Sequence, residues 1–195
     1  MSIETPTLTG TRSQLIPLQA THSRELFDIS RNPEIWAFMP FKIQTLDEMK
    51  RLVQDALEAQ DHGLELPFTV VDRTTDRIVG TTRYLNISEV NRHLEIGWTW
   101  YQPSVWRTRV NTECKYLLLN YAFSKLKVVR VQFCADKRNG RSHNAILRLG
   151  ATHEGTLRRH RVLSDGYIRD TCVYSILDGE WPTVESRLQE FLRRA

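Results

Sequence analysis

The 195-residue sequence has few cysteines and lacks any long apolar run. Cys114, Cys134 and Cys172 are far apart and form no Cys-x-x-Cys pair, so we expect neither a disulfide framework nor a zinc site. The six histidines show no metal-ligand spacing. No apolar stretch approaches the roughly 18 residues that a transmembrane helix requires. The first ten residues lack the basic and apolar regions of a secretory signal. These absences predict a cytoplasmic protein with no metal and no membrane contact.

The chain carries a moderate excess of basic over acidic residues. The net charge is +4 and the pI is near 9.1, with 41% hydrophobic and 26% charged residues. Such a composition is typical of a globular protein, and the chain shows no repeat, low-complexity tract or linker. We therefore expect one domain over residues 1–195. The positive charge favours an anionic partner, either nucleic acid, an acidic peptide or a phosphorylated cofactor.

Hydrophobic periodicity predicts strands and helices in mixed order. The expected strands are 8–18, 66–71, 78–87, 94–101, 129–135, 152–163 and 167–177. The expected helices are 23–30, 45–63, 110–122 and 182–192, with a short helix through Ala145, Ile146 and Leu149 that Gly150 ends. In the strand 94–101, strict alternation would place Leu94, Ile96, Trp98 and Trp100 on one face and Glu95, Gly97, Thr99 and Tyr101 on the other. The order indicates a mixed sheet with helices packed on it.

A basic loop precedes the helix 110–122. It reads Trp106-Arg107-Thr108-Arg109-Val110-Asn111-Thr112. A helix N-terminus has unpaired backbone N–H groups and a partial positive charge, so it suits a phosphate. Two arginines there add donors for pyrophosphate oxygens. The simpler alternative is a basic loop that only caps a helix.

Three segments in this order resemble known motifs. Residues Tyr101 to Phe123 resemble the acetyl-CoA-binding motif of the GCN5-related N-acetyltransferases (GNAT), and the nearest branch is RimJ/RimL-like. The run from Asn139 through Ser142 to Gly150 resembles the second motif of that branch. The closing hairpin is similar at Glu154-Gly155, Leu157-Arg158, Asp165-Gly166, Arg169-Asp170 and Tyr174. The resemblance covers nearly the whole chain and implies an α+β fold: a central, mostly antiparallel twisted sheet of about seven strands flanked by helices.

The resemblance has one departure. The family usually has glycines in the loop where this chain has Arg107 and Arg109. Glycine lets a backbone approach a phosphate closely. The loop must therefore adopt a non-glycine conformation that still offers its amides, or bind the cofactor more weakly.

The resemblance also implies a mechanism. An amine is protonated at neutral pH and must lose a proton before it attacks a thioester. Glu95 matches the glutamate that acts as general base in many relatives, often through water; otherwise it is a solvent-facing strand carboxylate. Ser142 matches the residue that protonates the departing thiolate in some relatives; otherwise it is the N-cap of its helix.

Further candidates follow from the same resemblance. Backbone groups of Trp98, Thr99 and Trp100 would pair with the pantetheine arm of acetyl-CoA, and one strand N–H would hold the oxyanion. Asn139 would anchor that arm or form a turn. Candidate cofactor-binding residues in the loop and helix are Arg107, Thr108, Arg109, Val110, Asn111 and Thr112. Trp36, Phe38 and Phe41 would wall the acceptor site, or belong to the core.

The function predicted from these residues is transfer of an acetyl group from acetyl-CoA to a primary amine. The acceptor is a protein N-terminal α-amine, or a small amine such as an antibiotic or metabolite. A different class is a catalytically silent acyl-CoA-binding module. A nucleic-acid binder rests only on the arginines of the run 158–161 and is not favoured; that run otherwise forms a solvated edge or recognises an acidic acceptor. We expect a monomer or homodimer.

Overall fold

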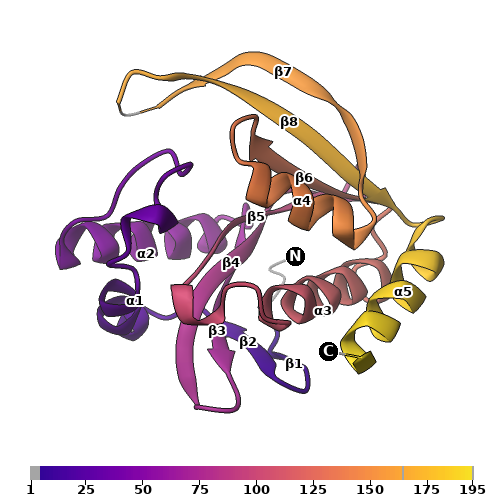
Figure 1. Ribbon diagram of the computed structural model, residues 1–195, viewed down its shortest axis with the longest axis horizontal. Helices are drawn as coiled ribbons and strands as arrows, with labels where there is room; N and C mark the ends of the chain where they lie inside the picture. Colours follow the sequence, from indigo (N-terminus) through magenta and orange to yellow (C-terminus); the bar gives the residue numbers. More distant parts are fainter. Residues whose placement is uncertain (1–4, 164, 195) are drawn as a thin grey trace.

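The computed structural model describes residues 5–163 and 165–194, which form one eight-stranded sheet with helices on both faces (Figure 1). The strands are β1 (Leu8–Thr9), β2 (Ser13–Pro17), β3 (Leu66–Asp72), β4 (Arg77–Ser88), β5 (His93–Tyr101), β6 (Arg130–Asp136), β7 (Thr152–Val162) and β8 (Ile168–Leu177). The α-helices are α1 (Ser23–Ile29), α2 (Leu46–Asp61), α3 (Val110–Ser124), α4 (Gly140–Leu149) and α5 (Trp181–Arg194). None of these helices is long and apolar enough to cross a bilayer.

The sheet confirms the predicted α+β class and is mostly antiparallel. Its strand order is β1-β2-β3-β4-β5-β6-β8-β7, and only β5 and β6 are parallel among these neighbours. The sequence predicted about seven strands because it assigned residues 8–18 to one strand. The structure divides that segment into β1 and β2, which pair with each other across a tight turn.

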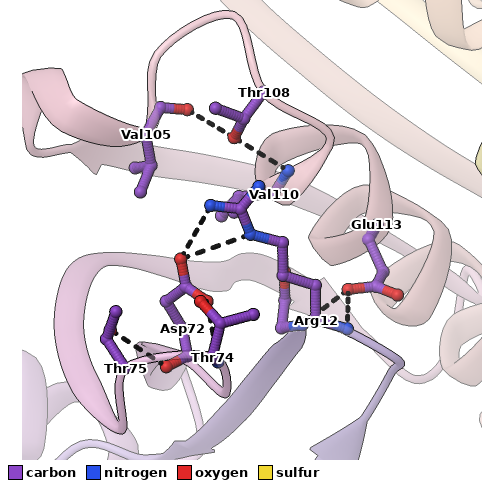
Figure 2. Close-up of polar contacts among 9 residues, drawn as sticks. Arg12, Asp72, Thr74, Thr75, Val105, Thr108, Val110 and Glu113 are labelled. Carbon is purple, nitrogen blue, oxygen red and sulfur yellow. Dashed lines mark hydrogen bonds and ion pairs between the residues drawn. The ribbon is translucent and has the colours of Figure 1, made fainter. Parts of the chain in front are cut away.

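That turn is stabilised from α3. The Glu113 carboxylate accepts hydrogen bonds from the backbone N–H groups of Thr11 (2.8 Å), Arg12 (3.0 Å) and Ser13 (2.6 Å). Glu113 is buried, and these three donors satisfy its charge. Figure 2 shows this contact beside the ion pair between Arg12 and Asp72. The first hairpin and α3 are thereby fixed to each other.

The two faces of the sheet have separate cores. The first core packs α3 and α5 against the sheet; its fully buried members include Phe68, Leu94, Leu118 and Leu119. The second packs α1 and α2 against the other face, where Met49, Val53 and Trp100 are buried. In Figure 1, α1 and α2 lie on one side of the sheet and α3 on the other. We call the face covered by α1 and α2 the α2 face.

The start of α2 follows the sequence prediction. Thr45 Oγ1 accepts from the Glu48 N–H, and the Glu48 carboxylate accepts from the Thr45 N–H (2.9 Å). This capping box fixes the first turn. Met49, Val53 and Ala56 then recur at helical spacing and bury one side of the helix.

The alternation of side chains along β5 fails at Trp98. The prediction that Trp100 shares a face with Leu94 and Ile96 was therefore wrong. The pairing with β4 shifts between Thr81↔Trp100 and Arg83↔Gly97, and Trp98 has a φ of 51°. A bulge of this kind inserts an extra residue, so the side chains after it change face. Leu94, Ile96 and Tyr101 therefore share the first core, whereas Trp100 belongs to the second.

Candidate functional site

The sheet divides between β5 and β6. The two strands are paired only at His93↔Arg130, Leu94↔Val131 and Glu95↔Gln132. Beyond Glu95, β5 continues to Tyr101 beside β4, while β6 continues to Asp136 beside β8. In the described part of the chain no pair joins residues 96–101 to β6, so this edge of β5 can receive an extended ligand by backbone pairing.

The bulge at Trp98 lies within this unpaired edge. A positive φ at a bulky side chain is strained, and such strain persists where the surroundings enforce it. The Trp98 ring stacks on Phe41 at 5.3 Å and lies 4.9 Å from the Arg83 guanidinium. Thr99 points the other way, where its hydroxyl accepts a hydrogen bond from Lys115 Nζ at 2.6 Å. The bulge is therefore supported by side chains on both faces.

Lys115 is a buried lysine that the sequence analysis did not single out. Its ammonium contacts the hydroxyls of Thr99 and Thr82 (3.3 Å). Burial lowers the pKa of Lys115 to about 7, because removal from water disfavours the charged form. No carboxylate in the described part of the chain pairs with it.

The basic loop leads to α3 with one of its two arginines in a left-handed conformation. Arg107 has a φ of 61°, which is left-handed and favours glycine, whereas Arg109 is right-handed with a φ of −72°. The Thr108 hydroxyl donates to the Val105 carbonyl (2.8 Å) and accepts from the Val110 N–H (3.3 Å), as Figure 2 shows. Thr108 thereby fixes the entry into the helix.

Backbone donors remain at the start of α3. The N–H groups of Asn111 and Thr112 donate no hydrogen bond to any residue in the described ranges, and neither does that of Arg107. These groups, with the partial positive charge of the helix end, can bind a phosphate. Arg148 from α4 adds a guanidinium here, since its Nη2 lies 3.3 Å from Thr112 Oγ1. No spacing pattern pointed to Arg148, because it lies 36 positions after Thr112 in the chain.

Arg109 has contacts beyond the loop. Its Nη1 lies 3.5 Å from the Leu192 carbonyl at the end of α5. Arg141, at the start of α4, lies 4.4 Å from the Trp106 ring and 3.5 Å from the Glu34 carboxylate. The loop is thus held between α4 and α5.

Glu95 lies where β5 and β6 part. Its side chain is on the α2 face and 8% exposed, so it is not the solvent-facing carboxylate of the simpler interpretation. Oε2 accepts from Asn86 Nδ2 and Gln132 Nε2, each at 3.1 Å. Cys134 is near enough for the Glu95 charge to add to burial in raising the pKa of its thiol to about 12. The thiol is therefore neutral beside the carboxylate.

Ser142 is not the N-cap of α4. The cap is Asn139, whose Oδ1 accepts from the Ser142 N–H at 3.0 Å. The sequence pattern contained two cap-forming residues three positions apart, and the helix begins one turn earlier than the serine would require. Ser142 is half-buried in the first turn, and its hydroxyl makes no hydrogen bond within the described residues.

The three aromatic candidates differ in burial. Trp36 is 3% exposed in the second core, where its Nε1 donates to the Ser30 carbonyl (2.9 Å). Phe41 lies between Trp36 and Trp98. Phe38 is half-buried, 5.8 Å from the Arg138 guanidinium. Phe41 therefore contacts Trp98 of β5, and Phe38 lies near Arg138, which follows β6. Trp36 is buried in the second core, in contact with Phe41.

The comparison with protein families decides the identity. The Acetyltransferase (GNAT) domain matches residues 12–152, which is more than half of the chain and includes the divided strands and the loop. The chain belongs to the GNAT acetyltransferase family. The uncharacterized N-acetyltransferase YoaA of Bacillus subtilis (strain 168) is 25% identical over 175 residues, covering 88% of this chain and 97% of YoaA.

Solved structures agree with this assignment. A GCN5-related N-acetyltransferase from Brucella melitensis superimposes with a TM-score of 0.92 at 28% identity, over 98% of this chain and 87% of the other. Mycobacterium smegmatis RimJ, solved in complex with CoA-disulfide, has a TM-score of 0.85 at 20% identity, over 97% and 96% of the two chains. The second similarity shows the fold alone. As a member of this family, the GNAT protein described here is an N-acetyltransferase.

Proposed function

We propose that this GNAT protein transfers the acetyl group of acetyl-CoA to a primary amine by direct attack of the amine on the thioester. One observation carries the proposal. The strands β5 and β6 part at Glu95, a buried carboxylate, and the edge of β5 beyond it is unpaired as far as the loop that leads to α3. The donor would supply an activated acyl group, and the chain would supply binding, orientation and a base.

The residues present suit acetyl-CoA. The pantetheine arm would pair with the backbone of Trp98, Thr99 and Trp100 along the edge of β5. The pyrophosphate would accept hydrogen bonds from the N–H groups of Asn111 and Thr112, beside the arginines of the loop. Arg107 adopts the left-handed conformation that glycine takes at no steric cost.

Proton transfer falls to two side chains. Glu95 would take a proton from the acceptor ammonium, directly or through one water. The free amine would then form the C–N bond while the C–S bond breaks. Ser142 would donate its hydroxyl proton to the leaving thiolate and take up in exchange the second proton that the nitrogen loses as it becomes an amide. An N–H on β5 would hold the carbonyl oxygen as it gains charge. No metal takes part in these steps.

We place the protein in the RimJ/RimL-like branch and in the reducing cytoplasm. The motifs of the second and closing segments support the branch. Cys114, Cys134 and Cys172 are all free thiols, which is typical of a reducing compartment. The acceptor on this basis is either a protein N-terminal α-amine or a small amine.

Calorimetric titration with acetyl-CoA tests the donor site. We expect micromolar binding to the wild type and at least tenfold weaker binding to an Arg107→Ala, Arg109→Ala double variant, since charge-assisted hydrogen bonds contribute about 1.5–3 kcal/mol each. Thermal unfolding of the variant must be checked because Arg109 also contacts α5. A folded wild type that does not bind acetyl-CoA would refute the proposal.

A screen of amines for CoA release tests the transfer itself. Release that depends on an acceptor supports an N-acetyltransferase of the proposed kind. Binding of acetyl-CoA without acceptor-dependent release across protein N-termini, amino acids, polyamines and aminoglycosides would favour the silent acyl-CoA-binding module instead.

A further inference from the structure

Arg169 is a buried arginine whose donors are unused. It lies on β8 and is 8% exposed. Its Nε is buried and donates to no group in the described ranges. Burial lowers the pKa of Arg169, yet a guanidinium stays charged in proteins. A buried charge of this kind is costly unless a partner of opposite charge comes to it.

Arg169 lies on the α2 face, as Glu95 does. Thr171 is paired with Asp136 of β6, and Arg169 is two residues from Thr171, so its side chain is on the same face. The charges of Asp136 and Glu95 both act on the Arg169 guanidinium. The side chain therefore extends over the part of the sheet that leads to the candidate base.

The nearby carboxylates are already engaged. Asp136 Oδ1 accepts from Arg138 Nε (3.0 Å) and its Oδ2 accepts from Arg138 Nη2 (2.8 Å). Glu95 Oε2 accepts from Asn86 and Gln132. Neither carboxylate forms a hydrogen bond with Arg169 in the structure. The Arg169 guanidinium is therefore attracted electrostatically by these two carboxylates, but it donates no hydrogen bond to their oxygens.

A second arginine lies directly opposite. Arg161 on β7 is the cross-strand partner of Arg169. Like charges in this relation are destabilising. The register shifts between Leu157 and Arg161, with Arg159 at a φ of 51°, and this irregularity sets Arg161 opposite Arg169. Arg161 is exposed and forms no ion pair with any described residue, so an anion that binds the pair would approach from the side of Arg161.

We propose that Arg169, assisted by Arg161, binds a carboxylate of the acceptor, and that the acceptor is a small amino acid that carries its amine and carboxylate in one molecule. The inference rests on the proposed function. Two parallel N–H donors of a guanidinium match the two oxygens of a carboxylate. With that end held on β8, the amine would extend towards Glu95. Arg169 is on this account a determinant of specificity that the acetyl transfer itself does not require.

Steady-state kinetics with paired acceptors tests this assignment. The panel contains amino acids with one to five carbons between amine and carboxylate, the matching primary carboxamides, and O-phosphoethanolamine. We expect kcat/KM for the preferred carboxylate to exceed that for its carboxamide at least tenfold. Arg169→Gln should remove this preference by raising KM about 10- to 100-fold for carboxylates while leaving the carboxamides unchanged. Arg169→Lys should restore part of it.

Matched variants separate specificity from folding. Arg77→Gln changes an exposed arginine at the start of β4 and should leave the kinetics with every acceptor unchanged. If Arg169→Gln does not fold, Arg161→Gln alters the exposed half of the pair and should raise KM selectively for carboxylates. Calorimetric titration of the CoA-bound protein with the preferred amino acid gives a second readout that does not require turnover.

The outcomes distinguish the two proposals. Equal use of carboxylates and carboxamides, an equal loss for both in Arg169→Gln, or a preference for the phosphate ester would overturn the carboxylate subsite while the acetyltransfer stands. Failure of all carboxylates to bind or react would overturn it as well. If no amine in the panel releases CoA but amino acids bind the CoA complex in an Arg169-dependent manner, the subsite stands and the transfer reaction fails.

Discussion

Gln132 Nε2 donates a hydrogen bond of 3.1 Å to Glu95 Oε2 across the last pair that joins β5 to β6. The bond fixes the carboxylate at the point where the two strands part. Glu95↔Gln132 is the last pair between the two strands, and the edge of β5 facing β6 is unpaired over residues 96–101. On the proposed mechanism, this bond would hold the base next to the place where the thioester lies.

The first prediction concerns Glu95 itself. Glu95→Gln keeps the size of the side chain but removes the base, so kcat at neutral pH should fall about 10²- to 10⁴-fold. The deficit should shrink as the pH approaches about 10, where a primary amine deprotonates without help. A full kcat profile from pH 6 to 10 measures both effects.

Binding distinguishes this role from a structural one. The affinity of the Glu95→Gln variant for acetyl-CoA, measured by titration calorimetry, should change less than threefold, about 0.6 kcal/mol. Glu89→Gln, on an exposed turn, is the control. A parallel loss of cofactor affinity would mean that Glu95 only maintains the junction of the strands.

The second prediction separates Ser142 from Asn139. Because Asn139 is the cap, Asn139→Ala should lower the free energy of unfolding by about 1 kcal/mol. Ser142→Ala removes a hydroxyl without a partner in the described structure and should leave stability within about 0.5 kcal/mol while slowing turnover. Urea unfolding and kcat, measured on both variants, give the comparison. Loss of stability in Ser142→Ala with unchanged kcat would contradict the acid role.

The third prediction follows from the two arginines of the loop. Arg107 is left-handed and Arg109 is right-handed, so substitution by glycine should change stability differently at the two positions. Arg107→Gly should be neutral or stabilising, whereas Arg107→Val should cost about 1–2 kcal/mol and weaken acetyl-CoA binding. Position 109 is the right-handed N-cap of α3, so glycine relieves no strain there and should bring no such gain in stability. A gain from glycine at both positions would show that backbone conformation does not govern this loop.

The sequence predicted the elements whose signals are local. Thr45 and Glu48 marked the start of α2, and the apolar period of residues 110–122 marked α3. The acetyltransferase fold followed from three motifs in order. The face of the sheet on which Trp98 lies was predicted wrongly, because a tryptophan does not mark a bulge in the sequence. The bulge arises from the register between β4 and β5. The roles of Glu113 and Arg169 were not predictable either, since Glu113 binds residues about 100 positions away and Arg169 depends on how β8 pairs with β6.

The fourth prediction concerns the stability contributed by Lys115. Its pKa is about 7 in the folded protein and near 10.5 in the unfolded chain. Between these values the unfolded chain holds a proton that the folded protein has lost, so the free energy of unfolding should rise with pH. The slope from one such group approaches about 1.4 kcal/mol per pH unit. Above pH 8.5 the buried Cys114 and Tyr101, whose pKa values are raised, would oppose this rise, so the useful window is pH 7 to 8.5.

Lys115→Met tests this directly, because it replaces the buried amine with an apolar side chain of similar length. We expect the variant to be as stable as the wild type at pH 7 or more so, and its free energy of unfolding to be flat between pH 7 and 8.5. Urea unfolding at half-unit steps measures both slopes. Equal slopes for the two proteins would show that Lys115 remains charged when folded. In that case its contacts with Thr99 and Thr82 would hold an ammonium beneath the bulge throughout, and acetyl-CoA affinity should then fall in the methionine variant.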